Sequence, residues 1–528
     1  MAKKATAKAQ DKALNLESIL FNCRDYLRSN AALMDKRDIL LTLVFLRFIG
    51  EKFEDAQAKM RQECIDNMGF TDEAIIANYL ASPKRYKNIV FVPEAARWSL
   101  IVDTPANKLN GVLDDALQAI DNSGAALKGC VRLGLFTSIN LEANVIKKVV
   151  DEINKISHKT FGEEKDLIGR VYEYFLKSFA VNATKEDGEF YTPHDIVELI
   201  AAFIEPFDGT LYDPCCGSGG MYVEAKQGDI TTVNVYGQES DPATYRLAKM
   251  NLAVRGISHH LGAKNASTFT NDLHRGDVFD YIMANPPFNL KKWYTPELSD
   301  DARWADYGLP PESNANYAWI LHMLSKIKAG KGVAGFLLAN GALGDTDTQA
   351  IRQKLIENDK VEAIIVLPRE LFYTTDISVT LWILNQNKRG GMRHGRNLRN
   401  REHEILFMDL RSWTENSVKG EQKKKFEISA EQVKRAADIY FRWQSVGTDG
   451  SAYAEPELYR SVGIDELREN DFSLVPSRYI EFVDRDTNID YDKVLTDTAV
   501  AVSDLLKLQQ ENDTTLRNAL NKLGYECK

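Results

Sequence analysis

The stretch L-Y-D-P-C-C-G-S-G-G, residues 211–220, carries the strongest fold signal in the chain. A short apolar run ends in an acid, Asp213, and a cluster of glycines then opens a turn into a helical pattern. Glycines at a strand-to-helix turn let a ligand approach the backbone closely. The spacing is neither G-x-x-x-x-G-K-[ST] nor G-x-G-x-x-G, so the turn is not the phosphate cradle of a nucleoside triphosphatase. It suits a nucleoside-type ligand without a triphosphate.

Strand and helix signals alternate around this turn from about residue 160 to 390. Apolar runs at 211–213, 233–236, 281–284, 332–339, 361–367 and 379–384 predict strands, and helical patterns lie at about 196–205, 242–254, 316–328 and 347–358. Apolar strands that alternate with helices are typical of a doubly wound, mostly parallel sheet covered on both faces. The predicted fold class is therefore α/β, and ligands of such sheets bind at the carboxyl ends of the strands.

Two more strand ends carry polar residues. Glu239 ends the second strand, 19 residues after Gly220, where an acid hydrogen-bonds the ribose in nucleotide-binding folds. The alternative for the turn and this acid is a tight turn followed by a solvated glutamate.

The run D-Y-I-M-A-N-P-P-F-N, residues 280–289, ends a later strand. Because a proline cannot donate to a strand ladder, this strand stops and presents an amide, a carbonyl and a phenyl ring together.

These motifs together resemble the methyltransferases that act on N6 of adenine and related exocyclic amines, whose patterns are D-P-x-x-G-S-G-G and (N/D)-P-P-(Y/F). The segment G-E-F-Y-T-P-H, residues 188–194, fits the same family, in which it wraps the methionine end of the cofactor. The resemblance implies S-adenosylmethionine as cofactor, a Rossmann-like methyltransferase domain and no metal. The implied cofactor-binding residues are Glu189, Phe190, Tyr191, Thr192, Pro193, His194, Asp213, Gly217, Ser218, Gly219, Gly220, Glu239 and, near the adenine ring of the cofactor, Asp272. The implied catalytic residues are Asn285, Pro286, Pro287 and Phe288.

The chemistry of such a site explains these residue types. The exocyclic nitrogen of adenine is a poor nucleophile because its lone pair is delocalised into the ring. The Asn285 side-chain oxygen and the Pro286 carbonyl would accept its two N–H bonds and localise that pair, while Phe288 offers a stacking face. The base must leave the duplex to reach them. Methylation at cytosine C5 is rejected, because Pro214-Cys215 lies inside the glycine turn and not at a second site.

A wider resemblance covers roughly residues 15–480 and points to the modification subunit of type I restriction–modification systems. It is carried by the motifs above together with D-I-L-L-T-L-V-F-L-R-F-I (38–49), N-A-N-Y-A-W-I (314–320), L-L-A-N-G-A-L (337–343) and I-I-V-L-P-R-E-L-F-Y-T-T (364–375). Four regions are expected: a flexible basic N-terminus at 1–13, a helical domain at 14–155, the catalytic domain with its extension at 156–485, and a helical tail for subunit contact at 486–528. The pattern of residues 403–485 assigns them no role.

Charge and composition bear on partners. The net charge of −10 has the wrong sign for a chain that holds DNA alone. The resemblance implies DNA as substrate, a separate specificity subunit that binds two methyltransferase subunits, and a restriction/translocase subunit. The six cysteines show no metal-ligand spacing, which favours reduced thiols in a cytoplasmic protein. The longest apolar run, 39–49, is too short for a membrane span.

Several assignments stay open in the sequence. The basic segment 388–401 predicts either phosphate contacts or a solvated hairpin tip, and Lys291 and Lys292 are candidates for contact with DNA. Leu505, Leu508, Leu516, Leu520 and Leu523 share one helical stripe that packs on its own domain or on partner helices. The rival functions are a methyltransferase that acts alone on RNA or protein, and a cofactor-binding assembly subunit. An intact N-P-P-F argues against the second.

Overall fold

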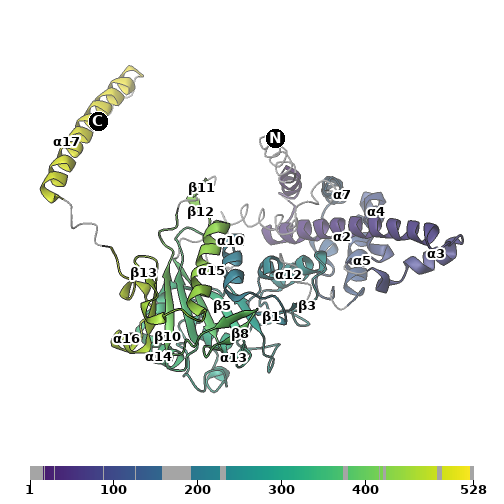
Figure 1. Cartoon of the computed structure of the whole chain (residues 1–528). Coiled ribbons are helices and arrows are strands. Elements are labelled where there is room, and N and C mark those ends of the chain that lie inside the picture. Colours follow the sequence, from purple (N-terminus) through teal and green to yellow (C-terminus); the bar gives the residue numbers. More distant parts are fainter. Residues whose placement is uncertain are drawn as a thin grey trace. The chain divides into compact units, whose positions relative to one another are not determined.

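The computed structural model describes residues 16, 18–28, 30–86, 89–124, 127–156, 192–225, 233–372, 378–414, 417–419, 424–483 and 490–523 (Figure 1). The chain divides into two compact units, Met1–Ile480 and Glu481–Lys528. The first unit holds the N-terminal helices and the sheet, and the second holds one long helix. Each unit is described by itself.

The N-terminal region is helical, as the sequence predicts. Its helices are α2 (Leu33–Asp66), α3 (Glu73–Leu80), α4 (Trp98–Asp103), α5 (Leu109–Asp121), α6 (Leu135–Ile139) and α7 (Ala143–Ile153), joined in part by the short 3-10 turns Pro83–Arg85, Glu94–Ala96 and Ala106–Lys108. The apolar run 39–49 lies within α2, and most of it is buried in one core with α5 and α7. No helix in the described part of the chain combines the length and apolarity of a membrane span.

A ten-stranded sheet forms the centre of the first unit. Its strands are β1 (Thr210–Asp213), β2 (Asn234–Gly237), β3 (His259–His260), β4 (Tyr281–Ala284), β5 (Val333–Ala339), β6 (Val361–Val366), β7 (Val379–Asn385), β10 (Glu404–Asp409), β13 (Ala454–Glu455) and β14 (Tyr459–Gly463). They lie in the order β13-β14-β10-β6-β7-β5-β4-β1-β2-β3. The predicted α/β class is confirmed.

The direction of the strands is more mixed than the sequence predicts. Strands β3, β2, β1, β4 and β5 are parallel neighbours, and β10 is parallel to β6. Strand β7, however, runs antiparallel between β5 and β6, and β14 and β13 are antiparallel too. The start of β7 pairs with the end of β6, Val366 opposite Thr380. The connection at 367–378 is at the lower limit of length for a helical crossover, which favours an antiparallel return.

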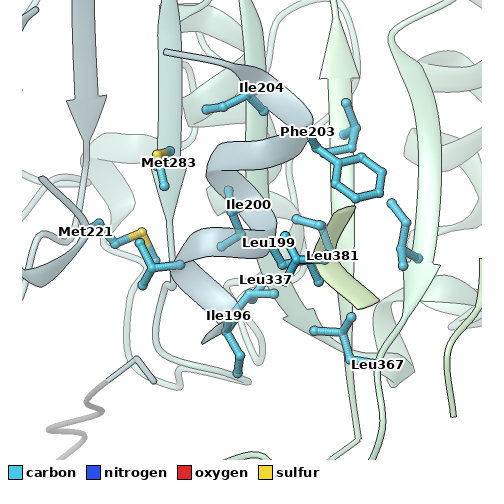
Figure 2. Packing of buried hydrophobic residues seen from close by; sticks show 14 of the residues in the cluster. Ile196, Leu199, Ile200, Phe203, Ile204, Met221, Met283, Leu337, Leu367 and Leu381 are labelled. Atoms are coloured by element: carbon cyan, nitrogen blue, oxygen red, sulfur yellow. The ribbon is translucent and has the colours of Figure 1, made fainter. Parts of the chain in front are cut away.

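Both faces of the sheet are covered. Along β7, Val379, Leu381 and Ile383 point into one core, whereas Trp382 and Leu384 point into the other, as the two-residue period of a strand requires. The first core is covered by α10 (His194–Ile204), α11 (Gly220–Ala225), α12 (Pro242–Val254) and α15 (Ala430–Gln444), and the second by α13 (Asn316–Lys326), α14 (Gln349–Glu357) and α16 (Ile464–Glu469). Figure 2 shows the apolar side of α10 on the sheet.

The extension at 403–485 enlarges the sheet. It contributes β10, β13 and β14, and its helix α15 packs against α10, where the rings of Phe203 and Tyr440 lie 4.9 Å apart. Two small hairpins stand apart from the main sheet, β8 (Gly391–Arg393) with β9 (Arg396–Leu398), and β11 (Ser417–Lys419) with β12 (Lys424–Phe426).

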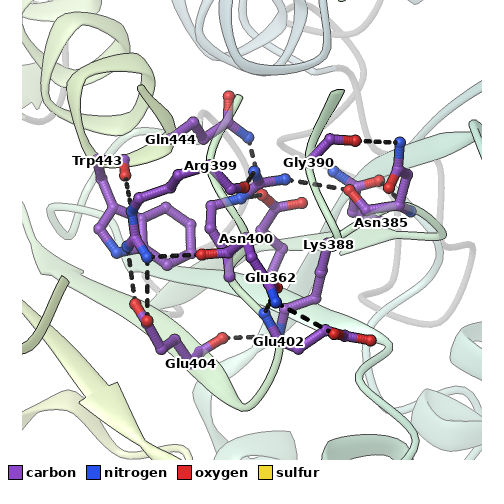
Figure 3. A network of polar contacts seen from close by, with 12 residues as sticks. Glu362, Asn385, Lys388, Gly390, Arg399, Asn400, Glu402, Glu404, Trp443 and Gln444 are labelled. Atoms are coloured by element: carbon purple, nitrogen blue, oxygen red, sulfur yellow. Dashed lines mark hydrogen bonds and ion pairs between the residues drawn. The ribbon is translucent and has the colours of Figure 1, made fainter. Parts of the chain in front are cut away.

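Most charged side chains of the basic segment 388–401 contact other groups of the protein. They fit neither the predicted phosphate contacts nor a solvated hairpin tip. Arg401 and Glu362 form an ion pair at 2.9 Å with both side chains fully buried. The ammonium of Lys388 is buried against Asp359 at 3.2 Å, and Arg399 pairs with a carboxylate at 2.7 Å. Figure 3 shows this network. These buried charges therefore tie the segment to the start of β6 and to β10, whereas Arg389 and the tip of the β8–β9 hairpin are exposed.

The second unit contains α17 (Tyr491–Lys522). Asp490 caps its start by accepting from the backbone N–H of Lys493 at 3.0 Å, and none of its side chains is buried. The leucine stripe lies on this helix, with Leu523 at its end. Its role in subunit contact stays a prediction.

Candidate active site

The predicted site residues follow three neighbouring strands at one edge of the sheet. Strand β1 lies between β2 and β4, and all three are parallel. Their carboxyl ends therefore bring the glycine turn after β1, Glu239 after β2 and Asn285 after β4 to the same edge.

The glycine turn is built over a buried carboxyl. Asp213 is only 2% exposed, and its Oδ1 accepts from the backbone N–H of Cys215 at 2.9 Å. Gly217 and Gly219 have φ of 54° and 76°, a region that side chains with a Cβ disfavour. Burial, assisted by the nearby Glu239 carboxylate, raises the pKa of Asp213 to about 7.

Glu239 holds the same turn from the neighbouring strand. Its Oε2 accepts from the backbone N–H of Gly217 at 3.0 Å, and its Oε1 accepts from that of Asp241 at 2.8 Å. Burial raises the pKa of this carboxyl too. The Ser240 hydroxyl also donates to Oε1, at 3.4 Å. A carboxylate has about four acceptor positions, so about one remains for a further hydroxyl donor. The Glu239 carboxylate and the glycine turn together therefore fit the ribose of a nucleoside.

Cys215 and Cys216 are inert in this turn. Burial raises the pKa of both thiols well above the usual value, so neither is a thiolate near neutral pH. This agrees with the rejection of cysteine-dependent methylation. Among the described residues, no group of three or more His, Cys, Asp or Glu side chains is placed to hold a metal ion.

Asp272 lies in a loop beside Glu239, but its carboxylate already has protein partners. Gln238 holds this loop by donating to the carbonyls of Ala266 and Asn271 at 3.0 and 2.8 Å. Asp272 forms an ion pair with Lys326 of α13 at 2.7 Å and caps the N–H of His274 at 2.9 Å. Its contact with a cofactor adenine stays a prediction.

The Asn285 amide is held on one side only. Its Nδ2 donates to Thr192 Oγ1 at 2.9 Å. Its Oδ1 is buried and has no hydrogen-bond partner among the described residues. A buried carbonyl without a donor costs about 1–3 kcal/mol, and such groups are rare. The arrangement leaves an acceptor at the edge of the sheet for a donor from outside the protein.

The chain after the tetrad is fixed by a set of asparagines. Asn289 and Lys292 adopt φ of 53° and 58°, a conformation that is costly for residues with a Cβ. Asn289 donates its N–H to Asn316 Oδ1 at 3.0 Å, and its Oδ1 accepts from Asn314 and Asn316. The strained turn is thereby anchored to the start of α13. Lys291 and Lys292 are exposed.

The sequence reasoning missed Phe372. Its ring lies 6.0 Å from that of Phe288, at 86°, and it is largely buried. Phe372 follows β6, so it approaches the tetrad from another strand end. The signal was an aromatic six residues after the end of a buried strand, within the run I-I-V-L-P-R-E-L-F-Y-T-T.

The segment predicted to wrap the cofactor is described only in part. Glu189, Phe190 and Tyr191 lie outside the described residues. Pro193 is the buried N-cap of α10. His194 is half exposed and lies 3.4 Å from Glu198.

Comparison with known proteins fits this geometry. The N-6 DNA methylase family model matches residues 163–487, and the HsdM N-terminal domain model matches residues 16–153. The HindI type I restriction enzyme methylase subunit of Haemophilus influenzae is 34% identical over 466 residues, which cover 82% of this chain and 100% of that protein. The MjaIX methylase subunit of Methanocaldococcus jannaschii is 28% identical over 530 residues, with 96% and 91% covered.

Solved structures support the fold. A type I restriction–modification methyltransferase subunit from Streptococcus thermophilus superposes with a TM-score of 0.69 at 23% identity, covering 89% of this chain and 100% of that chain. A modification subunit of a type I restriction enzyme from Vibrio vulnificus gives 0.56 at 19% identity, with 86% and 93% covered. With a family model over more than half of its length and a relative matched from end to end, the chain belongs to the N-6 DNA methylases, adenine-specific DNA methyltransferases, in the group of type I restriction enzyme methylase subunits.

Proposed function

We propose that this chain transfers a methyl group from S-adenosylmethionine to N6 of an adenine flipped out of DNA, at a site formed by Asn285, Pro286, Pro287 and Phe288. The observation that carries the proposal is the buried Oδ1 of Asn285, which has no partner among the described residues. An exocyclic amine offers two N–H donors. Asn285 Oδ1 accepts one of them and the Pro286 carbonyl accepts the other.

Both acceptors act on the nucleophile itself. Hydrogen bonds to the two N–H groups oppose delocalisation of the nitrogen lone pair into the ring, and they grow stronger as the nitrogen becomes positive. The asparagine-anchored turn holds both acceptors in place before the base arrives, which is preorganised electrostatic stabilisation. S-adenosylmethionine supplies the electrophilic methyl group when it is bound. No covalent intermediate with the enzyme is needed.

The cofactor belongs next to the glycine turn. Glu239 accepts from a ribose hydroxyl, while Gly217, Ser218, Gly219 and Gly220 let the cofactor approach the backbone. Asp213 supports the turn from below through its bond to Cys215. The family resemblance assigns the segment at 189–194 to the methionine side of the cofactor and Asp272 to its adenine side. The acceptor position left on Glu239 supports the placement of the ribose.

The base is held by aromatic side chains. Phe288 and Phe372 meet edge to face, a favourable arrangement for aromatic rings. A base that enters beside them stacks on Phe288 while its amine reaches Asn285. Extrusion from the duplex costs a few kcal/mol, and this stacking offsets part of that cost.

The choice of DNA sequence belongs to another subunit. The net charge of −10 opposes tight DNA binding by this chain alone. We propose a complex in which two copies of this chain bind one specificity subunit, with a restriction/translocase subunit added for cleavage. A structural neighbour at 19% identity and a TM-score of 0.56 comes from a study of complex assembly of the type I system, and the related methylase subunits are named as parts of type I restriction enzymes.

The test compares Asn285→Ala with the exposed Asn397→Ala as a matched control. Both are assayed with the specificity subunit for transfer from labelled cofactor to unmethylated DNA, and for cofactor affinity by calorimetry. We expect Asn285→Ala to lose transfer by at least about 100-fold, the scale of one lost transition-state acceptor, with cofactor affinity unchanged. The control should behave as wild type. Unimpaired transfer, or loss of cofactor binding, by Asn285→Ala would contradict the assignment.

The same assay addresses the rival substrates. Transfer by the isolated chain to RNA or protein, with none to DNA in the presence of the specificity subunit, would replace this proposal.

A further inference from the structure

The Asn285 amide has one side-chain hydrogen bond within the described residues, and it comes from far away in the sequence. Thr192 Oγ1 accepts from Asn285 Nδ2 at 2.9 Å across 93 residues of chain. Thr192 belongs to the segment that the sequence assigns to the cofactor, whereas Asn285 belongs to the reacting site. One hydroxyl therefore joins the two halves of the active site.

Thr192 lies on a rigid support. It directly precedes Pro193, the N-cap of α10, and a residue before proline is restricted to extended conformations. Asp195, in the first turn of α10, accepts from the backbone N–H of Ile428 at 2.8 Å. Helix α10 itself packs between β5 and α15 (Figure 2). The position of the hydroxyl is thus set by the fold.

The amide needs such support. The terminal torsion of an asparagine is broad and roughly two-fold, so the β4 strand end fixes the Cβ of Asn285 but not the plane of its amide. Among the described residues Oδ1 has no partner, and the hydrogen bond to Thr192 is the one that restrains the amide plane. Because Nδ2 donates to Thr192, Oδ1 is the atom left for the amine of the base.

We propose that Thr192 is a positioning residue for catalysis: its hydroxyl fixes the plane of the Asn285 amide so that Oδ1 is presented to the exocyclic amine. This inference rests on the proposed function. It differs from the cofactor-binding role that the sequence suggests for Thr192. Loss of a positioning residue lowers the rate of transfer at saturating cofactor, whereas loss of a cofactor-binding residue weakens cofactor binding.

The central variant is Thr192→Val, which removes the hydroxyl and keeps the branched shape. Holoenzyme assembled with the specificity subunit should show a fall in kcat of about 10–100-fold, the scale expected when a reacting group is misplaced by a fraction of an ångström to an ångström. The Kd for S-adenosylmethionine should change less than threefold by calorimetry. Thr192→Ser keeps the hydroxyl and should restore most of the rate.

A second pair of variants tests the hydrogen bond itself. A hydroxyl donates as well as accepts, so Thr192 can also hold a carboxylate at position 285. Asn285→Asp should therefore keep more activity with Thr192 than with Thr192→Val. Thr448→Val, which removes an exposed hydroxyl bonded to the carbonyl of Arg442 at 2.7 Å, is the matched control and should leave transfer unchanged.

The outcomes separate this inference from the proposed function. If Asn285→Ala is inactive but Thr192→Val is as fast as wild type, the positioning role is wrong and the proposed function stands. If Thr192→Val weakens cofactor binding and keeps kcat at saturation, Thr192 serves the cofactor and the inference is also wrong. If Asn285→Ala is active, the proposed function fails first.

Discussion

Several single residues in the site hold conformations or charges that the fold alone would not favour. Among the described residues, no cation forms an ion pair with the buried Asp213 carboxyl and no donor reaches the buried Asn285 Oδ1. Asn289 and Lys292 have positive φ. Each costs free energy of folding. Asp213 and Asn285 follow neighbouring strands, and such a cost is tolerated where a site is selected for binding and not for stability.

Burial of the Asp213 carboxyl predicts that the free energy of unfolding depends on pH. Its pKa is about 7 in the folded state against an ordinary value of 3.8. Between these values the folded state keeps a proton that the unfolded state has lost, so this carboxyl lowers the free energy of unfolding as pH rises, up to about pH 7. Asp213→Asn carries no such penalty. In urea unfolding without cofactor, its stability relative to wild type should rise by about 1–3 kcal/mol from pH 5 to pH 8.

A stability difference that does not change with pH would show that Asp213 stays ionised in the folded state. Asp115→Asn, at an exposed position on α5, is the control and should show no comparable pH dependence.

At the level of elements, the sequence predicts what depends on local pattern. Apolar periodicity gives the helices α10, α12, α13 and α14 and the strands β1, β2, β4, β5, β6 and β7 close to their observed bounds. The direction of β7 is not predictable this way, because V-T-L-W-I-L-N is buried on both faces in either direction.

Contacts between distant segments also carry no local signal. The sequence suggests that Arg401 is a surface charge, but the structure pairs it with the buried Glu362. It suggests a cofactor role for Thr192, but the structure places its hydroxyl against Asn285. The sequence predicts that the glycine turn, Glu239 and Asn285 lie at neighbouring strand ends, whereas the positions of Phe372 and of the Thr192 contact required the three-dimensional arrangement.

The Arg401–Glu362 pair should therefore behave as a buried ion pair. Arg401→Met leaves Glu362 buried with Gln444 as its remaining donor, and we expect a loss of about 3–5 kcal/mol in the free energy of unfolding. Arg401→Met combined with Glu362→Leu removes both charges and should recover a large part of that loss. Urea unfolding measures both variants.

The matched control is Arg389→Met. Arg389 is 85% exposed and pairs with Glu402 at 2.8 Å, and an exposed pair contributes at most about 1 kcal/mol. If the double variant is as unstable as Arg401→Met, the packing of the arginine stem and not its charge holds the extension.

On the scale of the whole molecule, α12 joins the N-terminal helices to the cofactor site. Leu247 and Met250 of this helix belong to the N-terminal core, whereas Ala248 and Leu252 belong to the core under the sheet. The helix starts three residues after Glu239, and its Asn251 donates to the carbonyl of Ser218 in the glycine turn at 2.9 Å. A movement of the N-terminal helices would therefore reach the cofactor turn through one rigid element.

The second unit contains a single long helix, α17. We predict that it serves subunit assembly and that the first unit binds the cofactor without it. Residues 481–528 form a compact unit of their own, so we expect the first unit to fold without them. The shortened chain should keep its cofactor affinity and its thermal midpoint to within about 2 °C, the shift that about 2 kcal/mol produces in a unit of this size. It should fail to co-purify with the specificity subunit, and DNA methylation should be lost with it.

Point variants in the full chain locate the contact. Leu508→Asp with Leu516→Asp places two charges on the leucine stripe, whereas Thr514→Asp with Asn518→Asp places two charges on the opposite side of the helix. Because burying an unpaired charge in an apolar contact is strongly unfavourable, the first pair should abolish assembly and the second should preserve it. Equal assembly by both pairs would mean that subunits meet elsewhere, and the stripe would then have no part in the complex.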